Sequence, residues 1–296
     1  MSVRIGTNPI AWSNDDMPEL GGETPLEVCL TEARQAGYAG MEMGGKFPKD
    51  PAVLRPILER HGLALISGWY SGELLNRRAE EEITAVQSHL DLLAAMGCKV
   101  MVYAETTGTV QNQRARPLSS RPRAEAGHWT DYGRRLTQVA EHFLEQGVQM
   151  AFHHHMGTVV ETEDEVDRLM ESTGDAVGLL VDTGHATFAG IDPLTLVRRY
   201  GPRINHVHCK DVRIDRLEKA KARDLSFMDA VVDGVFTVPG DGGIDFRAVL
   251  NALKEARYKG DWLVVEAEQD PAKAHPLTYA KKGYQTLSRL TEEIGL

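Results

Sequence analysis

The stretch HFLEQGVQMAFHHH, residues 142–155, contains the repeating unit that determines the predicted fold. Its first five residues have the spacing of an amphipathic helix, which ends directly before Gly147. Glycine is favoured just past a helix because it adopts the left-handed conformation without a Cβ clash. The short run that follows, VQMAF, is mostly apolar, as expected for a strand buried on both faces of a parallel sheet. Three histidines follow at the expected end of this strand.

The same unit of helix, glycine and apolar run occurs seven times along the chain, and a further apolar run opens the sequence. Eight strands, each followed by helical sequence, predict an α/β fold, a single (β/α)8 barrel of the TIM type. A doubly wound open sheet is the alternative, but the chain has neither a glycine-rich dinucleotide fingerprint nor a phosphate loop. The predicted strands lie near residues 4–10, 40–44, 63–70, 99–105, 148–154, 177–183, 204–211 and 261–268.

We expect residues 1–296 to form one barrel domain with two long loops. The loops, near residues 106–128 and 211–243, both follow predicted strands. In a barrel, loops that follow strands lie on the active face. The second loop includes PGDGG, residues 239–243, which is either a plain turn or a segment that closes over a ligand.

The charge balance argues against nucleic acid as a partner. The chain has 33 Lys and Arg against 43 Asp and Glu, a formal net charge of -10, which repels a phosphate backbone. Three widely spaced cysteines without a CxxC pair fit a reducing compartment. Because the sequence has no basic leader and no apolar run of about 18 residues, we expect a cytoplasmic protein without membrane contact.

Polar residues stand where the predicted strands end, which in a barrel is the catalytic mouth. Asp182 and Glu266 each follow three or more apolar residues, and His208 stands near the end of the seventh predicted strand. A lone buried His or Asp is most often a satisfied structural residue, but three together repel and desolvate one another without a compensating cation. Carboxylate and imidazole donors without cysteine suit a divalent first-row ion such as Mn, Co, Fe or Zn.

Strand alternation divides the histidine run. Successive residues of a strand point to opposite faces, so His153 and His155 can share one site while His154 points away. Which of the two inward histidines contacts the ion stays open.

The motif HVHCKD, residues 206–211, follows the same alternation. His206 and His208 share a face, and Lys210 projects with them towards the expected metal. Cys209 lies on the other face, where we expect it to pack in the core.

Several motifs together resemble one known superfamily. DTGH, residues 182–185, and HVHCKD resemble the xylose-isomerase-like TIM barrels, which include sugar isomerases, epimerases, endonuclease IV-type enzymes and dehydratases. The combination of HHHMGT, VFTVPGDG and VVEAEQDP is more specific and resembles the inosose dehydratases of bacterial myo-inositol catabolism. The matching segments extend from residue 6 to beyond residue 280, nearly the whole chain.

The resemblance implies a set of metal ligands at the ends of strands five to eight. Asp182, His208 and Glu266 fall on three of these positions. The fourth, a glutamate in many superfamily members, falls on the histidine cluster, and we assign it to His153 with His155 beside it. The dehydratases are associated with manganese or cobalt and also with glutathione, although the sequence shows no obvious glutathione site.

The resemblance also implies a reaction, the loss of water from 2-keto-myo-inositol (scyllo-inosose) through its enol to give a trihydroxycyclohexane-1,2-dione. The expected base is His155 or a metal-adjacent carboxylate, Glu266 or Glu268. The expected acid is His185, Lys210 or a metal-bound water, although His185 could equally be a helix-start residue that bonds a backbone carbonyl. The expected ring-hydroxyl contacts are Asn8, Trp12, Glu42, Lys46, Tyr103 and Arg213.

Three other functions compete with this interpretation. A metal-dependent ketose or inosose isomerase or epimerase would use the same barrel and the same enolisation. A DNA-repair nuclease would need a basic groove, and a noncatalytic sugar-binding protein would not need so many ionisable residues at the strand ends. Since superfamily barrels often pair, the resemblance also allows a homo-oligomer.

Overall fold

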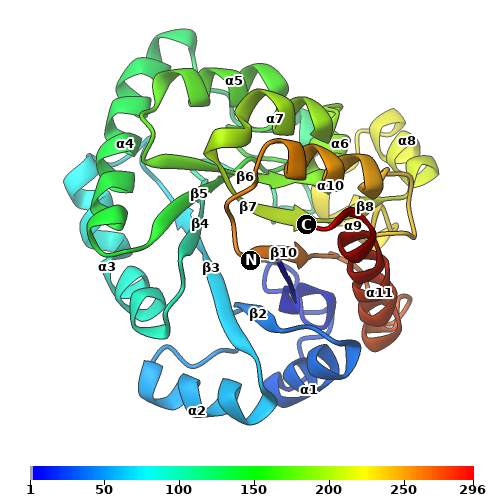
Figure 1. The fold of residues 1–296 in the computed structure, drawn as a ribbon. Helices are drawn as coiled ribbons and strands as arrows, with labels where there is room; N and C mark the ends of the chain where they lie inside the picture. The colour runs from blue at the N-terminus through cyan, green and yellow to red at the C-terminus, as the bar shows by residue number, and fades with distance from the viewer. Residues whose placement is uncertain (1–2) are drawn as a thin grey trace.

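The computed structural model describes residues 3–296 of the chain. Eight parallel strands close into a barrel in the order β1-β10-β7-β6-β5-β4-β3-β2, and helices surround it (Figure 1). This confirms the predicted α/β barrel and excludes the open sheet. The barrel strands are β1 (Arg4–Thr7), β2 (Gly40–Met43), β3 (Ala64–Gly72), β4 (Val100–Glu105), β5 (Gln149–His153), β6 (Val177–Asp182), β7 (Ile204–Cys209) and β10 (Trp262–Val265).

The helices form an outer layer in which sequence neighbours pack side by side, and the last helix closes the ring against the first. The helices of this layer are α1 (Leu26–Ala36), α2 (Pro51–His61), α3 (Ala79–Met96), α4 (Trp129–Glu145), α5 (Glu163–Ser172), α7 (Pro193–Tyr200), α10 (Phe246–Glu255) and α11 (Pro276–Ile294). The other helical elements are α6 (Thr183–Ala189), α8 (Ile214–Ala222), α9 (Phe227–Val232), and four 3-10 turns, η1 (Pro9–Ala11), η2 (Leu118–Ser120), η3 (Ala126–His128) and η4 (Gly201–Arg203).

Helix α4 shows why these segments are helical. Its buried side chains include Tyr132, Leu136, Val139 and Phe143, which recur at helical spacing and form one face against the sheet. Burying each large apolar side chain contributes roughly 1.5–3 kcal/mol. The chain then reverses at Gly147, whose φ of 77° is in the left-handed region that glycine occupies without strain.

The expected left-handed glycine occurs in four of the seven units and is absent from three. After α5 the chain leaves the helix in extended conformation at Thr173, Gly201 stays right-handed, and after α10 the left-handed residue is Arg257 with φ 56°. The glycines that behave as expected are Gly37, Gly62, Gly97 and Gly147.

Both long loops carry structure of their own. The segment 211–243 contains α8, α9 and an antiparallel hairpin of β8 (Asp211–Val212) and β9 (Phe236–Thr237). Its PGDGG segment wraps around Asp211, whose carboxylate accepts the backbone N–H groups of Gly240, Gly242 and Ile244. These hydrogen bonds favour the turn interpretation of this segment.

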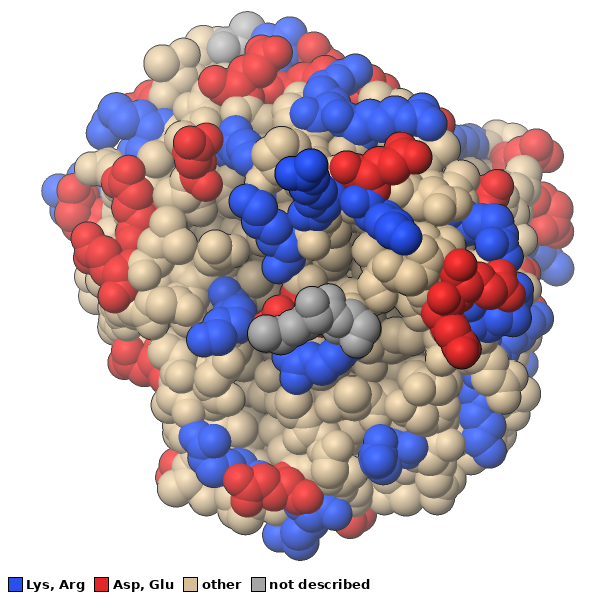
Figure 2. Space-filling view, viewed as in Figure 1, with Lys and Arg blue, Asp and Glu red and all other residues tan. Residues whose placement is uncertain are grey.

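The end of the barrel at which the strands begin is the face turned to the viewer in Figure 2. Val3 and Leu296 line one hollow there, so the two ends of the described chain lie close together. Lys and Arg side chains gather about the middle of this face, with Asp and Glu around them (Figure 2). The candidate site described below lies at the opposite end, where the strands finish.

Among residues 3–296, no helix combines the length and the apolar character needed to cross a bilayer.

A buried carboxyl outside the candidate site predicts a pH-dependent stability. Glu105 ends β4 and accepts N–H groups from Leu75 and Thr107, while burial raises its pKa to about 7. Because the native state holds this proton up to about pH 7 and the unfolded chain releases it near 4.5, the free energy of unfolding falls as pH rises between these values, by about 3 kcal/mol. Glu105→Gln removes this contribution, so denaturant titrations should show a shallower fall between pH 5 and 8. Equal slopes in both proteins would contradict the prediction.

Candidate active site

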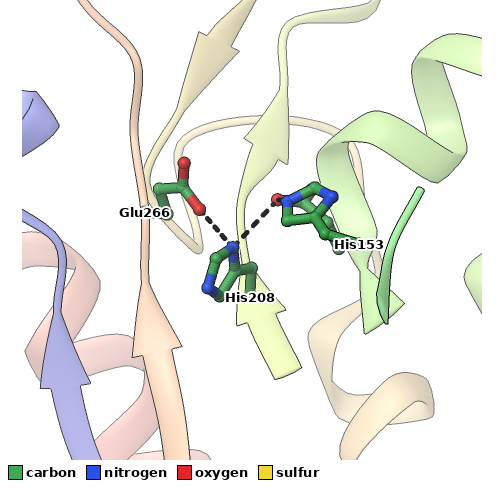
Figure 3. Close-up of side chains that lie close together, drawn as sticks. His153, His208 and Glu266 are labelled. Atoms are coloured by element: carbon green, nitrogen blue, oxygen red, sulfur yellow. Dashed lines mark ion pairs between the residues drawn. The ribbon is translucent and has the colours of Figure 1, made fainter. Parts of the chain in front are cut away.

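Four neighbouring strands bring one residue each to the mouth of the barrel. His153 ends β5, Asp182 ends β6, His208 lies near the end of β7 and Glu266 directly follows β10. Asp182 pairs in register with His208, so the two side chains leave their strands at the same height along the barrel. One ligand atom from each of the four lies within 4.8 Å of the others. Figure 3 shows His208 between Glu266 and His153, with Glu266 and His208 directed towards each other.

The polar atoms of this group are poorly satisfied by the protein itself. Asp182 Oδ2, His208 Nδ1 and Glu266 Oε2 are buried without a hydrogen-bond partner. Asp182 Oδ2 lies 3.5 Å from His208 Nδ1 and 3.7 Å from His153 Nε2, and Glu266 Oε2 contacts His208 Nδ1. Buried polar atoms without partners are costly, and a cation among them would satisfy all three.

The remaining hydrogen bonds of the group leave the correct atoms free for a metal. Asp182 uses only Oδ1 to cap α6, accepting the N–H of His185 at 2.8 Å. His153 Nδ1 lies 2.6 Å from the carbonyl oxygen of His154, so Nδ1 carries the proton and Nε2 keeps its lone pair. Two oxygen and two nitrogen donors therefore suit a divalent first-row ion, as the sequence predicts.

Glu42 supports this group from β2. Its carboxylate accepts hydrogen bonds from Asn8, Ser67 and His206 and lies 3.2 Å from His208 Nε2. Burial alone would raise the pKa of Glu42, but the two histidines hold it well below its usual value. Burial likewise opposes charge on His208, yet the carboxylates of Glu42 and Glu266 raise its pKa well above the usual value. A carboxylate behind a ligand histidine orients the ring and raises its basicity.

A second group stands beside the first, formed by His155, His185, Glu268 and Lys210. The rings of His155 and His185 contact each other with centroids 3.8 Å apart and an interplanar angle of 39°, and burial lowers the pKa of both well below the usual value. His155 Nδ1 lies 2.8 Å from the carbonyl oxygen of Met156, so its Nε2 is a free acceptor.

The neighbouring ring has different partners. His185 Nδ1 accepts the N–H of Met156 at 3.1 Å, and its Nε2 lies 3.0 Å from Lys210 Nζ. His185 thus accepts from a backbone amide, whereas its expected helix-start role would bond a carbonyl.

The two groups share one cavity at the mouth. His153, His155, His208, Glu266 and Glu268 all line it. Burial raises the pKa of Glu268 to about 7. The cavity therefore combines the possible metal ligands with a neutral imidazole acceptor and a carboxyl that can hold or release a proton near neutral pH.

Of the six predicted substrate contacts, the structure places two in the lining of the cavity and four outside it. Asn8 and Glu42 line the cavity. The other four have partners elsewhere: Trp12 donates to Glu32, Tyr103 donates to Glu82, Lys46 donates to the carbonyl oxygens of Gly22 and Thr24, and Arg213 pairs with Asp241.

Several lining residues were not predicted. Trp69 lies within β3, and its ring meets the rings of His153 and His155 edge to face. Asp16 and Gln111 come from two different loops and are joined by a hydrogen bond of 3.4 Å. None of them follows an apolar strand directly, so the pattern that marked the other candidates does not mark these.

Three further residues lie near the site, and the sequence made predictions for the first two. His154 is buried facing away, with both ring nitrogens unpartnered, and burial lowers its pKa to about 3. Cys209 is buried in the main core cluster, as expected. Glu161 pairs with Arg121 at 3.1 Å and lies outside the four-residue group.

A closed parallel barrel with converging ionisable side chains at its carboxyl mouth is the architecture of an enzyme. The family model described as "Xylose isomerase-like TIM barrel" matches residues 30–290. The chain belongs to this family.

Curated relatives narrow the class of enzyme. The chain is 55% identical over 295 residues to "Rhizopine catabolism protein MocC" of Rhizobium meliloti, covering 100% of this chain and 90% of that protein. It is 45% identical over 285 residues to "Inosose dehydratase" of Geobacillus thermodenitrificans, covering 96% and 95%. The protein is therefore an enzyme of the lyase class, related to the inosose dehydratases.

A solved structure supports the fold alone. A xylose isomerase-like TIM barrel protein from Mycobacterium smegmatis, solved in complex with magnesium, superposes with a TM-score of 0.71 at 17% identity. The match covers 99% of this chain and 98% of that one.

The arrangement of the four ligands predicts that replacing Asp182 strongly weakens metal binding. Asp182→Asn keeps an oxygen for the α6 cap but loses the charge, so Mn²⁺ affinity should fall by roughly 100-fold or more. Equilibrium dialysis with elemental analysis measures this.

Asp192→Asn is the matched control, because Asp192 caps α7 through its side chain and asparagine caps as well as aspartate. Unchanged affinity in Asp182→Asn, or an equal loss in Asp192→Asn, would contradict the assignment.

Proposed function

We propose that the protein eliminates water from 2-keto-myo-inositol, using a divalent metal held by His153, Asp182, His208 and Glu266. One observation carries the proposal: three buried ligand atoms without hydrogen-bond partners lie together, and two of their side chains, His208 and Glu266, line a cavity that two proton-transfer groups also line. The curated inosose dehydratases, which match nearly the whole chain, support the substrate.

When bound, a divalent ion acts as a Lewis acid that polarises the ketone and lowers the pKa of the adjacent C–H. His155 is the proposed base. Its Nε2 lone pair is free because Nδ1 bonds the Met156 carbonyl oxygen, and its lowered pKa keeps the ring neutral and able to accept a proton. The tilted ring of His185 and the edge-to-face contact with Trp69 fix its orientation.

Glu268 is the proposed proton donor to the departing hydroxyl. It lines the cavity, and a pKa of about 7 gives it a substantial protonated fraction at neutral pH. His185 and Lys210, the acids proposed from sequence, stand behind it: Lys210 Nζ donates to Glu268 Oε2 at 2.8 Å, and His185 Nε2 lies 3.7 Å from the same oxygen. We assign these two a positioning role.

The walls of the cavity suit a polyhydroxylated ring. Trp69 offers an apolar surface to the C–H face of a cyclohexane, while Asn8, Asp16 and Gln111 offer hydrogen bonds to hydroxyl groups around its edge. The side chains that line one cavity thus match both the apolar and the polar surface of such a substrate.

We further propose manganese or cobalt as the metal, because the mixed carboxylate and imidazole donor set suits either ion and the dehydratases that the sequence resembles are associated with these two. Glutathione as a second cofactor, a cytoplasmic location, the lack of a nucleic-acid partner and a homo-oligomeric state stay predictions from the sequence.

The product distinguishes a dehydratase from an isomerase. Metal-loaded protein incubated with 2-keto-myo-inositol should give a product lighter by one water molecule, with new ultraviolet absorption from the enol or dione. Mass spectrometry of the reaction provides the test. A product of unchanged mass would assign the protein to the isomerases and epimerases and overturn the proposal.

Replacing His155 should lower the rate of the reaction without changing the metal content of the protein. Loss of a general base typically costs about 10² to 10⁴-fold in kcat, so His155→Gln should fall in this range while still binding the ion. Steady-state kinetics and elemental analysis give the two readouts.

His154→Gln is the matched control, because His154 faces away from the cavity and makes no side-chain hydrogen bond. Loss of metal together with activity in His155→Gln would make His155 a ligand instead of the base.

A further inference from the structure

The ammonium of Lys210 occupies a position that resembles a cation site. Its Nζ is fully buried and lies 2.8 Å from Glu268 Oε2, 3.3 Å from Glu266 Oε1 and 3.5 Å from Asp182 Oδ2. Three carboxylates around one point are a donor set that a divalent ion also accepts. Two of these carboxylates, Asp182 and Glu266, belong to the proposed metal centre.

The surrounding residues fix the lysine in this position. The Lys210 backbone is locked to α6, because Thr183 Oγ1 accepts the N–H of Lys210 and donates to its carbonyl oxygen. Gly184 leaves room for the side chain, since a Cβ there would lie 2.6 Å from Lys210 Cγ. The ring of Phe236 covers Nζ at 4.7 Å.

We propose that the Lys210 ammonium takes the place of a second metal ion, so that the protein binds one divalent ion and not two. This rests on the metal centre proposed above. A second ion in the Lys210 position would stand beside a covalently tethered positive charge, and like charges within about 4 Å repel strongly in a buried site. Removing the ammonium leaves three carboxylates facing an open position, which a second ion can fill.

His185 contributes no ligand to that second position. Its Nδ1 already accepts the Met156 N–H at 3.1 Å, and its Nε2 lies 3.0 Å from Lys210 Nζ; because a neutral imidazole has one lone pair, the ring cannot serve both of these groups and a metal ion as well. Of the three carboxylates around Nζ, Glu268 is the one that the first ion does not use, so Glu268 decides whether a second ion binds.

The test is the number of Mn²⁺ ions bound per chain, measured by equilibrium dialysis with elemental analysis. We expect one ion in the wild-type protein, two in Lys210→Ala and one in Lys210→Ala/Glu268→Gln. Lys282→Ala, which removes an exposed lysine paired with Asp241, is the matched control and should bind one. Electron paramagnetic resonance should show isolated Mn²⁺ in the wild type and coupled ions in Lys210→Ala, because Asp182 and Glu266 would contact both.

Each result decides between distinct claims. Two ions in the wild-type protein, or one in folded Lys210→Ala, would overturn this inference while leaving the metal centre intact. No bound ion in the wild type would overturn the metal centre itself. If Lys210→Ala unfolds without metal, its thermal midpoint in Mn²⁺ and in chelator gives a second readout, and a larger Mn²⁺-dependent rise than in the wild type is the expected result.

Discussion

The burial of negative charge at the barrel mouth is the constraint on which the site depends. Four carboxylates, those of Glu42, Asp182, Glu266 and Glu268, are almost inaccessible to water. Two of them are compensated within the protein, Glu42 by His206 and His208, and Glu268 by Lys210. The atoms left unsatisfied belong to Asp182, His208 and Glu266, and they face one another. In the proposed metal centre, an added cation would complete this balance and would couple metal binding to the stability of the mouth.

The barrel makes this concentration of charge possible. Parallel strands end at one edge, so residues far apart in sequence meet there, while apolar side chains fill the interior below. Val100, Val102, Ala151 and Leu180 form one such buried cluster from β4, β5 and β6. The polar layer rests on this apolar layer, and the low dielectric strengthens both the repulsion between the carboxylates and their attraction for a cation.

Sequence periodicity predicts the strands and the residues that directly end them, because both depend on local pattern. The convergence of Asp182, His208 and Glu266 follows from that pattern alone, and so does the outward direction of His154. Contacts between segments that lie far apart in the sequence produce no local pattern from which they could be predicted. Trp12 and Tyr103 satisfy the same pattern yet turn into the core to bond Glu32 and Glu82, whereas Trp69 and Gln111 reach the cavity from positions that it does not mark. The choice between His153 and His155 also needs coordinates, because β5 ends at His153 and alternation ends with it.

The central claim is that one divalent ion is held by His153, Asp182, His208 and Glu266, with His155 left free as the base. Crystals of the protein loaded with Mn²⁺ and measured near the manganese absorption edge test this directly. The account predicts one anomalous difference peak, bonded to His153 Nε2, His208 Nδ1 and the carboxylates of Asp182 and Glu266. A peak bonded to His155, or no peak among these four side chains, would contradict it.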